Sequence, residues 1–196
     1  MYDADRGPWD EGPRGLGLVL DDERGSLPYE LLHGEALVAC AAWALGESGV
    51  DLVDASVTWG GLVDSGEDVV LHDALCPMTP PAFIADCLAQ ARATGDVVVG
   101  ARPVTDTVKV VSDDRVGATL DRDDLVAITS PLVLPAAVVA GLDRQPTTDL
   151  ARAVADLAAA GHRVRLVPAP SEGRRVSSVE DVRLLDALTS PQALSR

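Results

Sequence analysis

Lysine, aromatic residues and paired cysteines are scarce in this chain of 196 residues. Lys109 is the single lysine, and the aromatic residues amount to three Trp, two Tyr and one Phe. The three cysteines show no CxxC spacing and the three histidines are scattered, so the sequence predicts neither a disulfide framework nor a zinc site. The few aromatic side chains offer almost no platform for stacking bases. No apolar run approaches the roughly 18 residues that cross a bilayer, and no signal peptide is recognisable, so we expect a cytoplasmic protein.

Positive charge is also scarce, because 31 acidic residues face 16 basic ones and the formal net charge is -15. Such an excess repels both the phosphates of nucleic acids and anionic lipid surfaces. We therefore expect neither a nucleic acid nor a membrane as a partner. Basic residues are also unevenly distributed along the chain: from Gly25 to Ala91 there is no Lys or Arg but ten acidic residues.

What remains is an ordinary globular composition, with 47% hydrophobic and 24% charged residues. Residues 1–14 mix charge with Gly and Pro and lack periodicity, which predicts a flexible N-terminal arm. Residues 15–196 contain no linker or repeat, so we expect them to form a single domain with an aliphatic core.

Within that domain, segments typical of strands alternate with segments typical of helices. Strands are predicted over 15–20, 50–58, 68–72, 97–104, 124–129 and 162–170, and helices over 34–45, 80–94, 150–160 and 177–188. Residues 108–120 predict two short strands around an acidic turn, which together form a projecting β-hairpin arm. The pattern indicates an α/β fold with a mostly parallel sheet flanked by helices.

Three polar segments follow predicted strands, where α/β proteins bind ligands. They are HDALCP at 72–77, RPVTDTVK at 102–109 and TLDR at 119–122. Asp73 can hold a divalent cation or a ribose hydroxyl, or it can cap a turn. Lys109 can bind a phosphate, or it can be a solvated surface lysine.

In this order, the three segments resemble the methylerythritol phosphate cytidylyltransferase family, whose members carry HDAARP, PV-x-DT-x-K and TxDR. TTD at 147–149 and RRVSSVED at 174–181 are similar to the TD and IKVT-x-PED segments of that family. The resemblance runs from about Leu16 to Leu188. It implies a glycosyltransferase-A-like (Rossmann-like) fold whose hairpin arm reaches into a neighbouring subunit of a homodimer.

The family transfers CMP from CTP to methylerythritol phosphate, with magnesium, in isoprenoid precursor synthesis. By resemblance, Asp73 would hold the magnesium ion and the ribose, and Arg24 would take part in nucleotide binding. Arg122 would be contributed across the dimer. The residues implied around the phosphate of the acceptor sugar are Asp106, Thr107, Lys109, Arg122, Thr148, Asp149 and Arg175.

The same comparison of motifs reveals departures around the expected triphosphate site. The family carries a Gly-rich AAGxGxRM loop followed by PKQ, whereas this chain has LDDERGSLPYE at 20–30, with Tyr29 at the position of the catalytic lysine. The cytosine-reading GGxxRxxSV segment is missing, and HDAARP has exchanged its arginine for Cys76. We therefore expect a catalytically impaired pseudoenzyme that acts as a ligand-binding or regulatory protein. The alternative is an active magnesium-dependent nucleotidyltransferase with a triphosphate site rebuilt around Arg24 and Arg102.

Overall fold

The protein folds around a six-stranded sheet, seen in a computed structural model that describes residues 15–54 and 56–190. The strand order is β10-β6-β9-β5-β1-β4. β1 pairs in parallel with β4 and β5, β10 pairs in parallel with β6, and β9 runs antiparallel between β5 and β6. The prediction of a mostly parallel sheet is therefore confirmed. The strands are β1 (Leu16–Leu20), β4 (Asp51–Leu52), β5 (Val69–Asp73), β6 (Val97–Pro103), β9 (Val126–Leu134) and β10 (Val164–Pro168).

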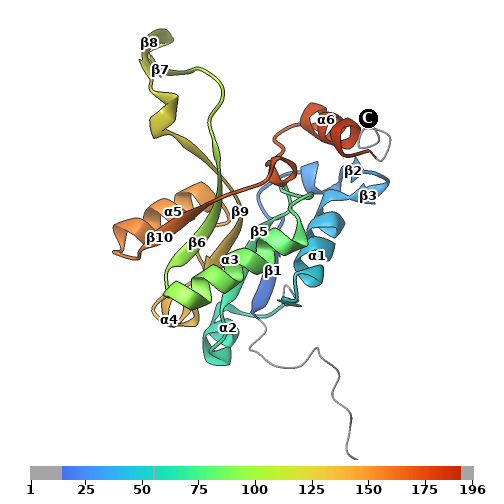
Figure 1. The fold of residues 1–196 in the computed structure, drawn as a ribbon, viewed down its shortest axis with the longest axis vertical. Coiled ribbons are helices and arrows are strands. Elements are labelled where there is room, and N and C mark those ends of the chain that lie inside the picture. Colours follow the sequence, from blue (N-terminus) through green and yellow to red (C-terminus); the bar gives the residue numbers. More distant parts are fainter. Residues whose placement is uncertain (1–14, 55, 191–196) are drawn as a thin grey trace, which may run out of the picture.

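Helices cover both faces of the sheet (Figure 1). One face packs against α1 (Leu37–Glu47) and α3 (Pro81–Thr94). The other packs against α2 (Trp59–Ser65), α4 (Ala136–Val139) and α5 (Leu150–Ala159). Because β5 and β6 are covered on both sides, their sequences VVL and VVV are continuous rather than alternating in hydrophobicity.

A smaller layer closes one corner of the molecule. It consists of α6 (Val179–Thr189), the short strands β2 (Leu31–Leu32) and β3 (Glu35–Ala36), and the 3-10 turns η1 (Leu27–Tyr29) and η3 (Ser171–Gly173). Leu32, Leu75 and Leu185 form part of its own buried cluster. No helix within 15–54 or 56–190 is long and apolar enough to cross a bilayer.

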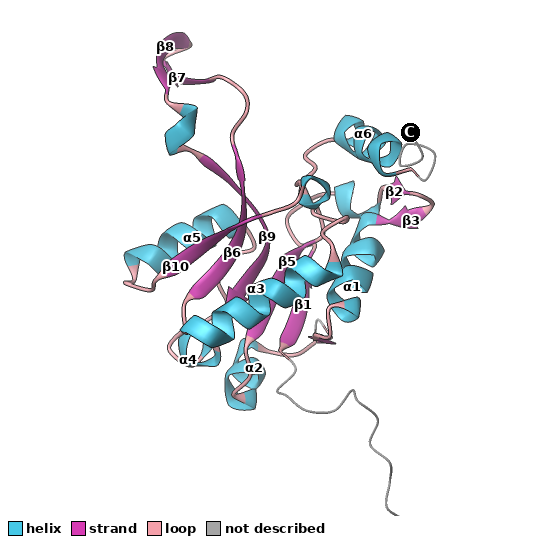
Figure 2. Cartoon of the chain, in the orientation of Figure 1, coloured by secondary structure: helices cyan, strands magenta, loops and turns pink. Residues whose placement is uncertain are grey.

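The predicted hairpin is the most distinctive projection of the fold (Figure 2). β7 (Val108–Ser112) pairs antiparallel with β8 (Arg115–Leu120), and Asp113 and Asp114 turn the chain with positive φ angles of 49° and 60°. The 3-10 turn η2 (Arg122–Asp124) leads back into β9. Every residue of β8 is exposed. The arm therefore has no covering from the described part of its own chain.

Some predicted boundaries differ from the structure for identifiable reasons. The strand predicted over 50–58 is only two residues long, because the chain turns at Asp54, whose side chain and carbonyl accept from the backbones of Ser56 and Val57. Thr58 then caps α2 by accepting from the Gly61 backbone. α6 is capped by Ser178, which accepts from the Asp181 backbone, one residue later than the spacing predicted. The arm predicted over 1–14 lies outside the described residues.

Candidate functional site

Polar residues from three distant segments meet where β1 and β5 end. Asp73 is the last residue of β5 and pairs in register with Leu20, the last residue of β1. Arg24 lies in the loop that follows β1, and Arg175 lies between η3 and α6. This is the carboxyl edge of the parallel strands, where the sequence predicts a ligand site.

The Asp73 carboxylate is held by two arginines. Its Oδ1 accepts from Nε of Arg24 at 2.7 Å and from the Leu75 backbone at 3.0 Å, and its Oδ2 accepts from Nε of Arg175 at 2.8 Å. The Asp73 side chain is only 3% exposed. We call this arrangement the arginine clamp, consisting of Arg24, Asp73 and Arg175. The Arg24–Asp73 bond is formed almost out of contact with water, where such a charge-assisted bond is strong, whereas the Arg175 side chain is 40% exposed.

The backbone behind the clamp is fixed by a close approach of two strands. The Asp73 backbone N–H donates to Oγ of Ser130 at 2.7 Å. Ser130 lies on β9 beside Gly100 of β6, where the pairing register shifts between Val99 and Ala101. A Cβ atom at Gly100 would lie 2.5 Å from the Ser130 carbonyl oxygen, so only glycine fits there.

All three guanidinium nitrogens of Arg24 bond to the protein itself. Besides the bond from Nε to Asp73, its Nη2 donates to the Thr148 carbonyl at 2.7 Å and its Nη1 donates to the Asp22 carbonyl at 3.2 Å. Its side chain is 6% exposed. Arg24 therefore joins the β1 loop to the segment before α5.

A cavity of about 420 Å³ opens beside the arginine clamp. Its lining includes three carboxylates, from Glu23, Asp73 and Asp149, but only two guanidinium groups, from Arg24 and Arg175. Asp149 caps α5 by accepting from the Ala151 and Arg152 backbones at 3.0 and 3.2 Å. The cavity thus carries no excess of positive charge, and the cap already satisfies two backbone donors at the N-terminus of α5.

The donor set does not fit a resident magnesium ion at Asp73. Magnesium demands several oxygen ligands in near-octahedral geometry. Both Asp73 oxygens are engaged by arginines, and within the described ranges no group of three or more His, Cys, Asp or Glu residues is arranged to hold a metal.

His72 and Cys76 of the HDALCP segment are buried and uncharged. His72 is fully buried, and neither ring nitrogen has a hydrogen-bond partner among the described residues. Burial lowers the pKa of His72 to about 4, although Asp73 opposes the shift. Burial likewise raises the pKa of the Cys76 thiol to about 12. Cys76 therefore supplies neither charge nor a reactive thiolate near neutral pH.

Tyr29, at the position of the family's lysine, points to an acidic neighbour instead of a phosphate-binding group. Its hydroxyl donates to Oδ2 of Asp21 at 3.2 Å. This bond and the charge of Asp21 raise the pKa of Tyr29. The side chain does not line the cavity beside the arginine clamp.

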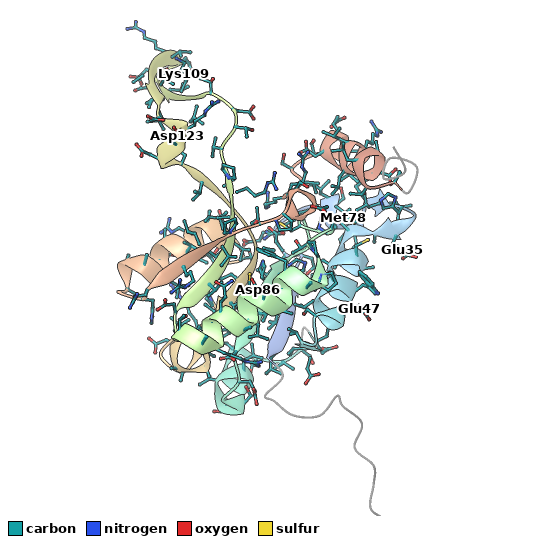
Figure 3. The ribbon with its side chains drawn as sticks, in the orientation of Figure 1. Glu35, Glu47, Met78, Asp86, Lys109 and Asp123 are labelled. Carbon is teal, nitrogen blue, oxygen red and sulfur yellow. The ribbon has the colours of Figure 1, made fainter. Side chains whose placement is uncertain are left out.

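The structure divides the predicted acceptor residues into two groups. Thr148, Asp149 and Arg175 line the cavity with Arg24 and Asp73. The others lie on or beside the projecting arm and do not line that cavity, and Figure 3 shows Lys109 near the end of the arm. Lys109 donates to the Thr119 hydroxyl, and Arg122 donates to the Thr105 carbonyl at 2.9 Å. The roles inferred for the arm residues Asp106, Thr107, Lys109 and Arg122 remain predictions.

Two residues of the site escaped the sequence analysis. Ser130 binds the Asp73 backbone, and Glu23 accepts from the Thr148 hydroxyl at 3.2 Å. Ser130 belongs to no motif, Glu23 lies in the segment 20–30 without a role assigned to it, and their partners are 57 and 125 positions away in the chain. Only the folded structure brings these pairs together.

The sheet order, the antiparallel β9 and the polar cavity at the carboxyl edge define a Rossmann-like α/β protein with a projecting arm. Comparison with known proteins then narrows the class. The sequence model of 2-C-methyl-D-erythritol 4-phosphate cytidylyltransferase matches residues 48–190. The chain therefore belongs to the 2-C-methyl-D-erythritol 4-phosphate cytidylyltransferase family.

Individual relatives agree with this placement. The chain is 34% identical over 135 residues to the bifunctional enzyme IspD/IspF of Clavibacter michiganensis subsp. michiganensis, covering 67% of this chain and 32% of the relative. It is 35% identical over 127 residues to the 2-C-methyl-D-erythritol 4-phosphate cytidylyltransferase of Deinococcus radiodurans, covering 62% of this chain and 53% of the relative. The matched segments thus span about a third to a half of these relatives.

Solved structures share the fold over nearly the whole chain. The 2-C-methyl-D-erythritol 4-phosphate cytidylyltransferase from Thermus thermophilus has a TM-score of 0.67 at 17% identity, covering 90% of this chain and 98% of that one. A crystal structure of 4-diphosphocytidyl-2C-methyl-D-erythritol synthase has a TM-score of 0.70 at 18% identity, covering 91% and 99%. The glycosyltransferase-A-like fold implied by the sequence motifs is therefore confirmed.

Proposed function

We propose that this chain is a catalytically impaired member of the family, which binds a sugar phosphate or a regulatory partner in the cytoplasm instead of transferring CMP from CTP. The observation that carries the proposal is the arginine clamp. Arg24 and Arg175 neutralise Asp73, and the three guanidinium nitrogens of Arg24 all bond within the protein.

The charge of the site supports this proposal. A triphosphate brings about four negative charges, and nucleotidyl transfer depends on cations aimed at the charge that develops in the transition state. The cavity beside the clamp has more carboxylates than guanidinium groups. Losing a single such donor typically lowers a rate by about 100- to 1,000-fold, and this site lacks several together.

The chain around the site offers no replacement for these cations. From Gly25 to Ala91 there is no Lys or Arg, and Tyr29 bonds to Asp21. With no fitting donor set at Asp73, the proposal includes no resident magnesium ion. A rebuilt, active triphosphate site would need cations from outside the cavity lining.

The projecting arm is the proposed source of the remaining positive charge. We propose a homodimer in which the arm of each subunit packs against its partner, because Val111 and Val116 are 64% and 72% exposed on the arm. Lys109 and Arg122 would then join the cavity of the neighbouring subunit. Two added cations would suit one phosphate group of an acceptor sugar better than a triphosphate with its metal ion.

Titration calorimetry with methylerythritol phosphate tests this assignment. The wild-type protein should bind the sugar phosphate, and Lys109→Ala and Arg122→Ala should each weaken binding by about tenfold or more. Arg115→Ala is the matched control, since Arg115 lies at the turn of the same hairpin outside the predicted phosphate site. Equal affinities for all four proteins would contradict the proposed phosphate site.

A further inference from the structure

A second and larger cavity, of about 920 Å³, lies between α1, α6 and the loop that follows β5. Cys40 and Trp43 line it from α1, Leu185 and Leu188 from α6, and Met78 from the loop. We call it the apolar groove. It shares no lining residue with the cavity beside the arginine clamp, and it lies in the corner of the molecule marked by Met78 and Glu35 in Figure 3.

Two helices, α1 and α6, form walls of the apolar groove, and each contributes residues from one of its faces. The lining positions of α1 include Ala39, Cys40 and Trp43, and those of α6 include Leu185 and Leu188. Spacings of three and four residues place side chains along one side of a helix. Each wall therefore presents an apolar stripe, with open space between the two.

Large apolar side chains remain uncovered at the edge of the groove. Trp43 is 64% exposed and Leu188 is 52% exposed. A contiguous exposed apolar surface with a polar rim is typical of a protein interaction site. Trp is also among the residue types most enriched at the positions that dominate binding energy.

The charges of the rim indicate the chemistry of the partner. Glu35 and Glu172 line the groove with one cation, Arg174. The stretch that supplies β2, β3 and α1 carries no Lys or Arg. The α1 side of the groove therefore has one acidic residue, Glu35, and no basic one, which favours a basic partner by charge complementarity.

We propose that the apolar groove is a docking site for a basic amphipathic helix of a partner protein. The apolar stripe of that helix lies between α1 and α6 against Trp43 and Leu188, as in other helix-in-groove interactions. Its Lys and Arg side chains flank the stripe and meet Glu35 and Glu172. This inference goes beyond the proposed function, because it assigns a second surface and holds whether or not the cavity beside the clamp binds a sugar phosphate.

The test uses a fluorescein-labelled helical peptide of about 18 residues, roughly five turns, with Leu along one side and Lys elsewhere. Fluorescence anisotropy measures its binding to the full chain. Wild type should bind with micromolar affinity, and Leu188→Asp should weaken binding by about tenfold or more because a carboxylate would enter the apolar wall. A peptide with Glu in place of each Lys should bind about tenfold more weakly than the Lys peptide.

Leu184→Asp is the matched control for folding and for added charge. Leu184 lies on the same helix and is 50% exposed, close to the 52% of Leu188, but it does not line the groove. Its affinity for the Lys peptide should stay within about twofold of wild type, and circular dichroism should give both variants the same helix content.

Three results would overturn the proposal. If Leu184→Asp and Leu188→Asp weakened peptide binding equally, the peptide would be binding through general surface charge and not in the groove. Absence of binding to wild type at about 100 μM peptide would mean that the groove does not accept such a helix. Self-association lost in Leu188→Asp and kept in Leu184→Asp would identify a second copy of the chain as the occupant.

Discussion

Arg175 and Asp73 are 102 positions apart in the sequence, yet Nε of Arg175 lies 2.8 Å from Oδ2 of Asp73. The other Asp73 oxygen is held by Arg24 at 2.7 Å. The same short segment sends Arg174 into the apolar groove. One stretch of chain between η3 and α6 therefore contributes to both cavities for which we infer a binding role.

The stability of the fold should depend strongly on the Asp73 charge. Asp73→Asn leaves the guanidinium of Arg24, which is 6% exposed, without its counter-charge. Breaking a buried pair from one side typically costs about 3 to 5 kcal/mol. Urea denaturation should show a loss of free energy of unfolding in that range.

The matched control for this charge removal is Asp156→Asn. Asp156 pairs with Arg152 on the surface of α5, where the two side chains are 58% and 71% exposed. Exposed pairs contribute about 1 kcal/mol or less. If both substitutions lowered the free energy of unfolding equally, the clamp would not be the buried interaction described above.

His72 should make the protein less stable in mild acid. Its pKa is about 4 in the folded protein against 6.5 for the free side chain, so between these values the unfolded chain binds a proton that the folded chain does not. Stability is therefore lost as pH falls through this window, by about 3 kcal/mol between pH 7 and pH 4. His72→Leu should remove this part of the pH dependence in urea melts.

The same urea melts would also reveal the result that contradicts this prediction for His72. A His72→Leu profile that falls between pH 7 and pH 4 as steeply as wild type would show that the imidazole is protonated in the folded protein. Leu fills a similar space without a polar atom, so the variant should also fold at pH 7.

The hairpin should hold the proposed homodimer together. Val111 and Val116 face each other across β7 and β8. Val111→Glu places a charge in that apolar surface and should yield monomers at micromolar concentration in sedimentation equilibrium. Leu166→Glu on β10, where the leucine is 47% exposed, is the control and should leave the assembly unchanged.

Restoring the family's lysine should not restore catalysis. Tyr29→Lys adds one cation at an exposed position, but the Gly-rich loop is absent and Arg24 and Arg175 stay bound to Asp73. Pyrophosphate release from CTP and methylerythritol phosphate should remain at the background of the wild-type chain. A large gain from this single change would show that the lost loop is unimportant.

The fold could be predicted largely from local sequence signals. Gly95 and Gly161 follow α3 and α5 as expected, and both have positive φ angles, of 70° and 92°. α2 escaped prediction because it is a single short helix with two glycines, which have low helix propensity. β9 extends to Leu134 beyond the predicted 129, since its apolar end is stabilised by neighbours on both sides.

The sequence predicted some of the residues that line the cavity, but not their arrangement. Motif resemblance singled out Arg24, Asp73, Thr148, Asp149 and Arg175, all of which line one cavity. It assigned Asp73 to a magnesium ion, whereas the fold pairs it with two arginines. Contacts between residues 49 and 102 positions apart leave no local pattern in a single sequence.

Titration calorimetry of the wild-type protein with CTP and magnesium at millimolar concentration tests the central claim most directly. The account predicts no binding heat and no pyrophosphate release, because Arg24 is bonded within the protein and carboxylates outnumber guanidinium groups in the cavity. A dissociation constant tighter than about 100 μM, or roughly 5.5 kcal/mol, would contradict it and would mean that the triphosphate site has been rebuilt.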